Sequence, residues 1–449
     1  MRSHKLLVLL LCFLTGPAFA GYMTLLGSGI GNGPIAQSNF TQPIYASNLA
    51  ALNAVATFTR SDATPTATYF DSTGVLKTVT SATDPRFGYV YNGSAWVAGG
   101  LIVEPVAATN SAPYSSVLSN WTPSNGTVTN NSGATLDPAG TNTATLINPT
   151  GGSITNVAPP AFTAAGTTTY TASAYLKNAG GAGIAAVGFY DATNSLLYIA
   201  RFDLSTGANT SVTAGVTALT SVNIGNGWWR VSAKWTSAAN TASIIPAIYP
   251  YGTGGANPTS ADKIYYWGPQ WEAGGYASSY IANPSAGTTT RAAETVQFNG
   301  PALAAVTGPS ASIIFEGSAD YIDTNGIVFI GAQAAFSVPL YATSASSAVA
   351  YDAGNSRLFG PAVSGGGSWS TTGREGIALS ASGASIAMGG GAVVTTGTPF
   401  GAGAISNLYL GRTSSTAYAN TYRYKSIGLY NQRIQDTTLQ TKTTVGAGY

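Results

Sequence analysis

The side chains that most often perform catalysis are scarce in this chain. Its one histidine and its one cysteine, His4 and Cys12, both lie within the first twenty residues. That stretch has a basic start, an apolar run over 6–14 and a small-residue ending, which is typical of a cleaved secretory signal. We therefore expect a signal peptide over 1–20 and a mature protein without histidine or cysteine. Such a protein has no Ser-His-Asp triad, no Cys-His pair and no thiolate zinc site.

Two alternatives to cleavage before Gly21 stay open. An uncleaved signal anchor would have a similar composition, although the apolar run of nine residues is too short to span a bilayer. Translation from Met23 would omit the segment and make the protein cytoplasmic at synthesis. Cleavage, the first interpretation, predicts a secreted, extracellular protein without membrane insertion.

Carboxylates are the remaining candidates for catalysis, and the chain has only 16 of them. A glycosidase needs two at a separation of about 5 to 10 Å. Glu316 and Asp320 are four residues apart, a spacing that alternates poorly on a strand and favours a solvated pair or a turn contact. Asp320 and Asp323 could hold a calcium ion with nearby carbonyl oxygens, but turn capping is the simpler interpretation. We therefore expect no enzyme and no cofactor, with structural calcium as the alternative.

Aromatic side chains in a nearly neutral chain indicate a different function. Only 8% of the residues are charged, against roughly 25% in an ordinary domain. Beyond 1–20 the chain carries 16 basic and 16 acidic residues without a basic cluster, which argues against nucleic-acid binding. Phe, Trp and Tyr make up 11% of the chain, too many for a disordered protein. A neutral surface rich in aromatic side chains suits carbohydrates, whose apolar faces stack on aromatic rings.

Alternating residues over 228–235 predict a half-buried antiparallel strand. Trp229 and Trp235 lie on its apolar face and are expected in the core. Trp228 lies on the other face beside Arg230, so these two are candidates for contact with a sugar.

Three further aromatic residues are candidate ligand contacts. Tyr249 and Tyr251 share one face at the end of a predicted strand, just before a glycine-rich loop. Trp271 lies in a motif with two tryptophans over 266–274, near the end of an aromatic-rich region that covers residues 108–293. Packing in a core is the alternative for each of them.

Many short apolar stretches separated by Gly, Asn, Ser and Thr predict an all-β fold of sandwiches or jelly rolls. The chain of 449 residues is long enough for two or three domains. A glycine-rich run over 27–33 has no strand before it and no helix after it, so we interpret it as a linker rather than a phosphate loop. The clearest expected features are a strand over 170–176, a hairpin of 188–190 and 196–202 joined by 191–195, and short helices over 48–55 and 437–441.

A series of motifs resembles a segment of phage and prophage tail or fibre proteins. In those proteins the segment leads into a carbohydrate-binding-module-like jelly roll, which the resemblance places here over 108–293. Trp229 and Trp271 depart from the pattern, which more often has Tyr and Leu. The motifs are Phe58-Thr-Arg60, Pro85-Arg86-Phe87, Leu101-Ile-Val-Glu104, Gly225-Asn-Gly-Trp-Trp-Arg-Val231, Tyr266-Trp-Gly-Pro-Gln-Trp-Glu-Ala-Gly274, Ser279-Tyr-Ile281 and Thr290-Arg-Ala-Ala-Glu294.

The last part of the chain resembles a concanavalin A-like, laminin-G-type sandwich. Leu408-Tyr-Leu-Gly-Arg412 and Ile427-Gly-Leu-Tyr-Asn-Gln-Arg-Ile434 carry this resemblance, with Leu439 where such domains place a closing helix. The expected organisation is therefore a small β-rich region over 21–107, the jelly roll, and a sandwich over 294–449.

The resemblance implies a non-catalytic glycan-binding or receptor-binding protein of a phage tail, a fibre or a bacterial surface appendage. Its partner would be a cell-surface glycan or polysaccharide, and it would be secreted or virion-associated and associate with itself. The predicted ligand-binding residues are Trp228, Arg230, Tyr249, Tyr251 and Trp271. The alternative is a purely structural protein that assembles through its sandwiches without affinity for glycans.

Overall fold

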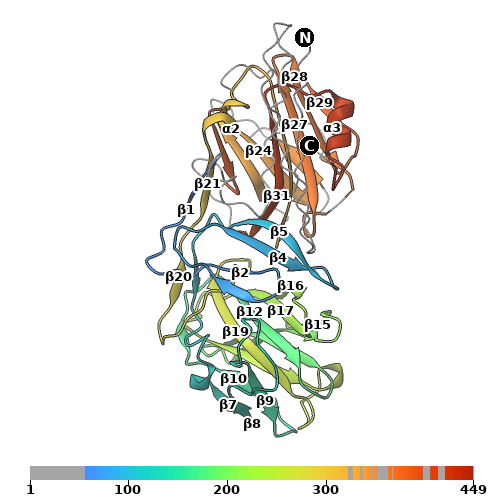
Figure 1. The fold of residues 1–449 in the computed structure, drawn as a ribbon. Coiled ribbons are helices and arrows are strands. Elements are labelled where there is room, and N and C mark those ends of the chain that lie inside the picture. The colour runs from blue at the N-terminus through green and yellow to red at the C-terminus, as the bar shows by residue number, and fades with distance from the viewer. Residues whose placement is uncertain are drawn as a thin grey trace, which may run out of the picture. The chain divides into compact units, whose positions relative to one another are not determined.

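The computed structural model describes residues 56–321, 327–333, 337–344, 347–350, 363–366, 368–397, 405–412 and 420–447. The features expected at 1–20, Met23, 27–33, 48–55 and Asp323 lie outside these residues. Within them the fold is all-β, as predicted, with antiparallel strands and two short α-helices (Figure 1). None of the helices in this described part is long and apolar enough to cross a membrane.

The middle of the chain forms a sandwich of two sheets. Its strands are β7 (Thr122–Ser124), β8 (Gly126–Thr129), β9 (Thr145–Pro149), β10 (Asn156–Ala158), β11 (Phe162–Thr163), β12 (Thr169–Asn178), β13 (Ile184–Asp191), β14 (Leu196–Asp203), β15 (Asn209–Val212), β16 (Val216–Asn223), β17 (Trp228–Thr236), β18 (Ser243–Tyr251) and β19 (Ile264–Ala273). Sheet 1 has the order β15-β14-β13-β18-β10-β7, with β11 on β18. Sheet 2 has the order β16-β17-β12-β19-β9-β8.

Local sequence explains why these strands form. The predicted hairpin is the β13–β14 pair, in which Asp191 lies opposite Leu196. The Asp191 carboxylate closes the turn by accepting hydrogen bonds from the backbone N–H groups of Thr193 and Asn194, at 3.0 and 3.1 Å, as aspartate does in Asx-turns. On β17, Val231, Ala233 and Trp235 are buried between the sheets, with Trp229 packed against them. The predicted apolar face of this strand is therefore confirmed.

The remaining strands form a second sandwich. They are β1 (Ala56–Thr59), β4 (Arg86–Tyr91), β5 (Trp96–Val103), β21 (Thr295–Phe298), β22 (Ala311–Ala319), β23 (Ile327–Gln333), β24 (Ser337–Ser344), β25 (Ser347–Ala350), β26 (Val363–Ser364), β27 (Gly373–Ser380), β28 (Gly383–Met388), β29 (Val394–Thr396), β30 (Asn407–Leu410) and β31 (Tyr422–Tyr430). Sheet 3 has the order β29-β28-β27-β22-β31-β5-β4, and sheet 4 has the order β1-β21-β30-β23-β24-β25-β26.

Strands from the start of the described chain complete both sheets of this second sandwich. Strand β1 pairs with β21, placing Phe58 opposite Val296, and β5 pairs with β31, placing Leu101 opposite Tyr424 (Figure 1). Two small two-stranded sheets stand apart from these: β2 (Thr68–Phe70) pairs with β3 (Leu76–Thr78), and β6 (Ala108–Asn110) pairs with β20 (Thr289–Arg291). The region expected as a small unit over 21–107 thus contributes strands to sheets whose other members lie far downstream.

Two short helices accompany this sandwich, α2 (Gly300–Ala304) and α3 (Asp436–Lys442). The predicted helix over 437–441 corresponds to α3. An acidic residue in its first turn and a basic residue in its last complement the helix dipole. Leu439 is buried and packs with Ile314 and Tyr430 against the outer face of sheet 3. One part of that face is therefore covered by α3.

A buried network of charged side chains lies at the ends of strands β1, β4, β5 and β20. We call it the arginine–carboxylate network; its members are Arg60, Asp62, Arg86, Glu104, Arg291 and Glu294. Arg86 Nη2 lies 2.7 Å from a carboxylate oxygen of Glu104 and of Glu294. Arg60 pairs with Glu294 at 2.8 Å, and Arg291 pairs with Glu104 at 3.1 Å. The charges balance, and the side chains of the three arginines and two glutamates are 0% exposed.

Glu104 connects the network to both sandwiches. Ser279, which follows the jelly-roll strands, donates to it from its backbone N–H at 2.7 Å and its hydroxyl at 2.6 Å. The Thr421 hydroxyl, just before β31, donates to it at 2.7 Å. Burial alone would raise the pKa of Glu104, but Arg291, Arg86 and the Ser279 hydrogen bonds hold that pKa well below its usual value.

A second buried carboxyl, Glu375 on β27, has no such compensation. Its side chain is buried, and neither carboxyl oxygen has a hydrogen-bond partner in the described part of the chain. Its cross-strand neighbours are the apolar Phe315 and Met388. Burial raises the pKa of Glu375 well above its usual value, because an ionised carboxylate is costly away from water.

We expect Glu104→Gln to lower the free energy of unfolding by about 3–5 kcal/mol, because it leaves buried guanidinium groups unpaired. The folded-state pKa of Glu104 is depressed, so the unfolded chain binds more protons as pH falls below about 4.3. The wild-type protein should therefore lose stability in that range, and the variant should lose less. Urea unfolding at pH 7 and pH 3.5 measures both effects.

Thr421→Val and Lys77→Ala complete this test. The first removes one hydrogen bond to Glu104, with an expected loss of about 1.5–3 kcal/mol. The second removes the Lys77 side chain, 49% exposed and 3.9 Å from Asp71, and should change stability by less than about 1 kcal/mol. Equal effects of the two substitutions would contradict a central role for the network.

We expect Glu375→Met to raise the free energy of unfolding at pH 7 by about 1–3 kcal/mol, since it removes an unpaired buried carboxyl. The raised folded-state pKa makes wild-type stability fall as pH rises above about 4.3, and the variant should lack this slope. Glu316→Met is the matched control, because Glu316 is paired with Arg374 at 3.2 Å. A loss of stability in Glu375→Met would show that this carboxyl has a stabilising partner.

Candidate ligand-binding cleft

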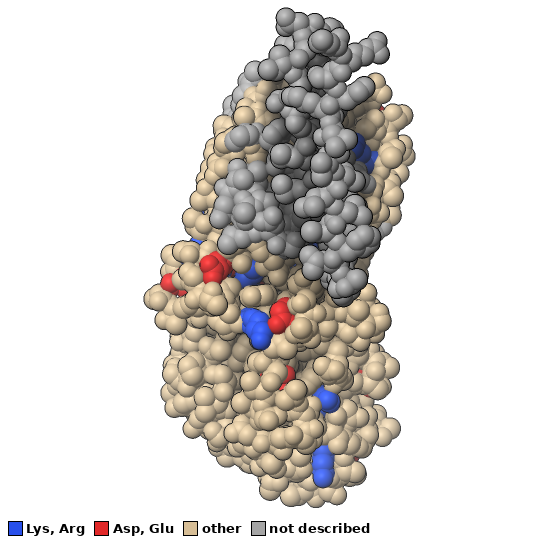
Figure 2. Space-filling view, viewed as in Figure 1, with Lys and Arg blue, Asp and Glu red and all other residues tan. Residues whose placement is uncertain are grey.

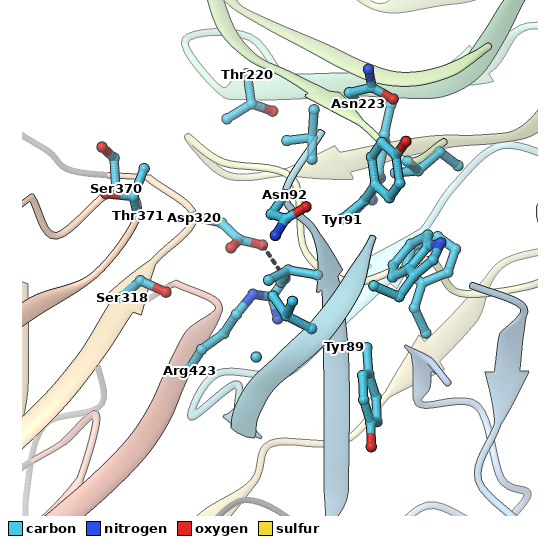
Figure 3. Close-up of a pocket in the computed structure, with 18 of the residues that line it drawn as sticks. Tyr89, Tyr91, Asn92, Thr220, Asn223, Ser318, Asp320, Ser370, Thr371 and Arg423 are labelled. Carbon is cyan, nitrogen blue, oxygen red and sulfur yellow. Dashed lines mark hydrogen bonds and ion pairs between the residues drawn. The ribbon is translucent and has the colours of Figure 1, made fainter. Parts of the chain in front are cut away.

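A cleft of about 560 Å³ lies between the exposed part of the outer face of sheet 3 and the edge of sheet 2 at β16 (Figure 3). Its lining comes from the β4–β5 hairpin, from β16 and β17, from the end of β22, from the turn before β27 and from β31. The principal lining residues are Tyr89, Tyr91, Asn92, Trp96, Thr220, Asn223, Arg230, Ser318, Asp320, Tyr321, Ser370, Thr371, Thr372, Arg423 and Lys425.

The β4–β5 hairpin supplies an aromatic wall. Tyr91 and Trp96 are partly exposed, and their ring centroids are 5.7 Å apart. Tyr89 is also partly exposed and lines the cleft, but its ring points away from that of Tyr91 (Figure 3). The turn is fixed by Asn92, whose side-chain oxygen accepts hydrogen bonds from the following backbone, including the N–H of Ala95 at 2.9 Å. A rigid turn holds the rings in place, which lowers the entropy cost of ligand binding.

A glycine fixes the position of Trp96. Gly74 has a φ of +80°, and a Cβ atom there would lie 2.1 Å from the indole Nε1 of Trp96. Only glycine suits this backbone and this close approach. On its other side, Trp96 packs on Phe70 with ring centroids 4.8 Å apart. The aromatic wall therefore depends on the β2–β3 segment beneath it.

The opposite wall is polar and charged. Asp320 and Arg423 form an ion pair at 2.9 Å, with side chains 31% and 20% exposed, and Figure 3 shows the pair inside the cleft. Lys425 donates a hydrogen bond to the Thr372 hydroxyl. Because side chains alternate along a strand, Arg423 and Lys425 share the outer face of β31, whereas Tyr424 between them is in the core.

Arg230 and Lys234 extend from β17 toward this wall. The Arg230 guanidinium lies 5.5 Å from the centre of the Tyr175 ring and donates to the Ser278 carbonyl oxygen at 2.5 Å. Its Nε is buried without a hydrogen-bond partner. The Lys234 ammonium donates to the Tyr321 hydroxyl at 2.9 Å, which links sheet 2 to the end of β22.

Burial changes the protonation equilibria in the cleft. Burial raises the pKa of Asp320, although Arg423 acts in the opposite direction. Burial lowers the pKa of Lys425, and Glu316 opposes this effect only in part. Both shifts indicate that charges here are incompletely solvated, so electrostatic contacts with a ligand would be stronger than on an open surface.

Four of the five ligand contacts predicted from the sequence are buried. Trp228, Tyr249, Tyr251 and Trp271 are 2%, 3%, 1% and 0% exposed. Trp228 donates from Nε1 to the Leu136 carbonyl oxygen at 2.9 Å, and Trp271 donates to that of Gly188 at 3.2 Å. In this conformation none of the four rings has a face open to a sugar. Arg230 alone lines the cleft.

The outer face of sheet 2 is buried by residues distant in the sequence. Trp228 lies in a cluster with Leu76, Trp267 and Tyr280, against which Phe70 and Trp96 pack. Tyr251, the predicted ligand contact on sheet 1, is also packed against another side chain. The Arg201 guanidinium lies 4.3 Å from the centre of its ring. Alternation assigns a side chain to a face but does not reveal what covers that face.

The aromatic wall is not among the sites predicted from the sequence. Tyr89 and Tyr91 alternate along one strand and precede the Asn92-Gly93 turn, a pattern typical of a hairpin. That pattern could have singled out these two tyrosines. Asp320, by contrast, was considered for a carboxylate pair and for calcium, and the structure pairs it with Arg423.

The structure gives no support for the calcium site that the sequence offered as an alternative. The described residues contain no group of three or more His, Cys, Asp or Glu side chains placed to hold an ion. The expected calcium site included Asp323, which lies outside the described residues, and Asp320, which forms the ion pair with Arg423.

Comparison with known proteins shows no family. No family model matches the chain, and no curated protein matches it. Matching structures include Trypanosoma rangeli sialidase in complex with the inhibitor DANA, at 12% identity and a TM-score of 0.22, with 55% of this chain and 48% of the sialidase covered. This chain thus spans about half of that sialidase. A mutant of the sialidase displaying trans-sialidase activity matches at 10% identity and a TM-score of 0.24, with 67% and 60% covered.

Domains LG4-5 of the mouse laminin alpha1 chain match at 10% identity and a TM-score of 0.20, with 60% of this chain and 86% of the laminin chain covered. Scores this low carry no argument about activity. None of the three is a phage protein, and the expected tail-fibre resemblance stays a prediction.

One expectation from the sequence is corrected by these comparisons. The chain was expected not to be an enzyme, but the structures that match it include sialidases, which are enzymes. We therefore do not maintain the non-catalytic interpretation, and the likeness equally assigns no sialidase activity.

We expect Trp228→Ala to lower the free energy of unfolding by about 3–5 kcal/mol, because it empties a packed site in the core. Leu196→Ala, which changes a side chain on a residue that is 51% exposed, should alter it by less than about 0.5 kcal/mol. Urea denaturation followed by tryptophan fluorescence measures both. Full stability of Trp228→Ala would show that the ring is not part of the core.

Proposed function

We propose that the cleft binds a saccharide and that the protein recognises a cell-surface glycan or polysaccharide. The observation that supports this proposal is the pairing of a partly exposed aromatic wall, Tyr89, Tyr91 and Trp96, with a facing wall of hydroxyl and charged groups. Saccharides have both apolar C–H faces and hydroxyl edges. They therefore fit a site that offers rings on one side and hydrogen-bonding groups on the other.

The hydrogen-bonding groups of the cleft are varied. Asn92 and Asn223 offer amide groups, and Thr220, Ser370 and Thr371 offer hydroxyls. Such groups donate and accept, as sugar hydroxyls do. A volume of about 560 Å³ lies within the usual range of roughly 300–1,000 Å³ for ligand sites.

The surroundings of the cleft support the same class of ligand. Most of the described surface visible in Figure 2 is neutral, with few charged side chains. A surface of this kind does not attract nucleic acid over long distances. We further propose an extracellular or virion-associated location and association between copies of the chain, as the sequence motifs suggest.

We expect Tyr91→Ala to weaken glycan binding about 5- to 100-fold, in line with the loss of roughly 1–3 kcal/mol from one stacked aromatic ring. A glycan array probed with residues 21–449 would identify the ligand, and calorimetry would measure its affinity. Tyr190→Ala is the matched control, because Tyr190 is also partly exposed but lies on sheet 1 outside the cleft.

The outcomes separate the possibilities. Weaker binding by Tyr91→Ala with unchanged binding by Tyr190→Ala supports the cleft. The reverse pattern places the site on the outer face of sheet 1 and overturns the proposal. A folded, oligomeric protein that binds no glycan on the array favours the structural alternative.

A further inference from the structure

We propose that the saccharide bound in the cleft is acidic, and that its carboxylate or sulfate group binds beside Arg423 and Lys425. This inference rests on the proposed saccharide binding and adds the chemical class of the ligand. It follows from the distribution of charge in the cleft, from the partners of the basic groups and from their spacing on β31.

The cleft has an excess of positive charge. Arg230, Arg423 and Lys425 line it, whereas Asp320 is the one carboxylate among its lining residues. The whole chain is nearly balanced, with 18 basic and 16 acidic residues. A local excess inside a partly enclosed site attracts anions more strongly than the same charges on an open surface.

Two of the three basic groups form no salt bridge within the described residues, although Glu316 acts on Lys425, and Glu272 and Asp320 act on Arg230, over a longer distance. Lys425 contacts a hydroxyl, that of Thr372, and Arg230 contacts a carbonyl oxygen and an aromatic ring, with Nε left unpaired. Burial also lowers the pKa of Lys425, which indicates that nearby acidic groups do not fully compensate its charge. A bound anion would supply that compensation.

Arg423 and Lys425 are placed to act together. They are two residues apart on β31 and both line the cleft, and Lys425 lies at a β-bulge in the pairing of β31 with β22. Arg423 uses Nη2 for Asp320, and a guanidinium has further N–H donors. An anionic group between the two side chains would therefore accept charge-assisted hydrogen bonds from both, while the sugar ring faces the wall that contains Tyr91.

Matched pairs of saccharides test this inference. The probes are oligosaccharides of galacturonate, mannuronate and glucuronate, each compared with its carboxyl-reduced, neutral form by calorimetry at pH 7. We expect the acidic form of at least one pair to bind about 10- to 100-fold more tightly than its neutral form, as charged hydrogen bonds imply. Raising the salt concentration from 50 to 500 mM should reduce this preference.

Variants connect the preference to its residues. Lys425→Gln should reduce the acidic-to-neutral affinity ratio about tenfold, whereas Lys425→Arg should retain most of it. Arg433→Gln is the matched control, since it removes a partly exposed arginine whose ion pair with Asp436, at 2.6 Å, lies outside the cleft. Thermal unfolding of each variant verifies that it is folded.

The results distinguish the inference of an acidic ligand from the proposal of saccharide binding on which it rests. Equal binding of acidic and neutral forms, with loss of both in Tyr91→Ala, would overturn the acidic ligand and keep the saccharide site. An acidic preference unchanged in Lys425→Gln would place the anion elsewhere and overturn the inference. If none of the six probes binds, the proposed class of acidic ligand is overturned. If no glycan on the array binds, the saccharide site itself is overturned.

Discussion

The rest of the structure depends on a buried ion-pair network of three arginines and three carboxylates. Charges removed from water are costly unless each is paired and hydrogen-bonded, and here Arg86 contacts both glutamates while Ser279 and Thr421 add hydrogen bonds to Glu104. These residues come from five separate parts of the chain. Any arrangement that separates one of these parts from the others removes an ion pair or a hydrogen bond from a buried charge. The network therefore favours one specific arrangement of strands more than it adds net stability.

The network and the cleft lie at opposite ends of the same two strands. Arg86 begins β4 and Glu104 directly follows β5, whereas Tyr91 ends β4 and Trp96 begins β5. One end of the hairpin is fixed by ion pairs, and the other end supplies the aromatic wall. Since β5 also pairs with β31, the strand that carries Arg423 and Lys425 has a defined position relative to those rings. The geometry of the cleft thus follows from the interactions that hold the hairpin in sheet 3.

Much of the fold could be predicted from the sequence, because alternation and turn chemistry act over a few residues. The β13–β14 hairpin, the apolar face of β17 and helix α3 were all evident. The partners of β1 and β5 were not, since those strands pair with segments hundreds of residues downstream. The same limit explains the misplaced site: Trp228 lies on the face that alternation predicts, but Leu76 and Phe70, both distant in sequence, help to bury it. The motifs resembling tail-fibre proteins contain Arg60, Arg86, Glu104, Arg291 and Glu294, so these charged residues of the motifs form the network rather than a binding surface.

The scarcity of charge gives the remaining charges distinct roles. With 8% charged residues, the protein places three of its arginines in the buried network and three further basic residues around the cleft. In the network each cation is balanced, so its effect is confined to structure. In the cleft the cations exceed the carboxylates, and the surrounding surface has few charges that could mask the difference. For the proposed ligand, a modest excess of this kind would have a large influence on binding, because electrostatic selection depends on the local charge balance and not on the total.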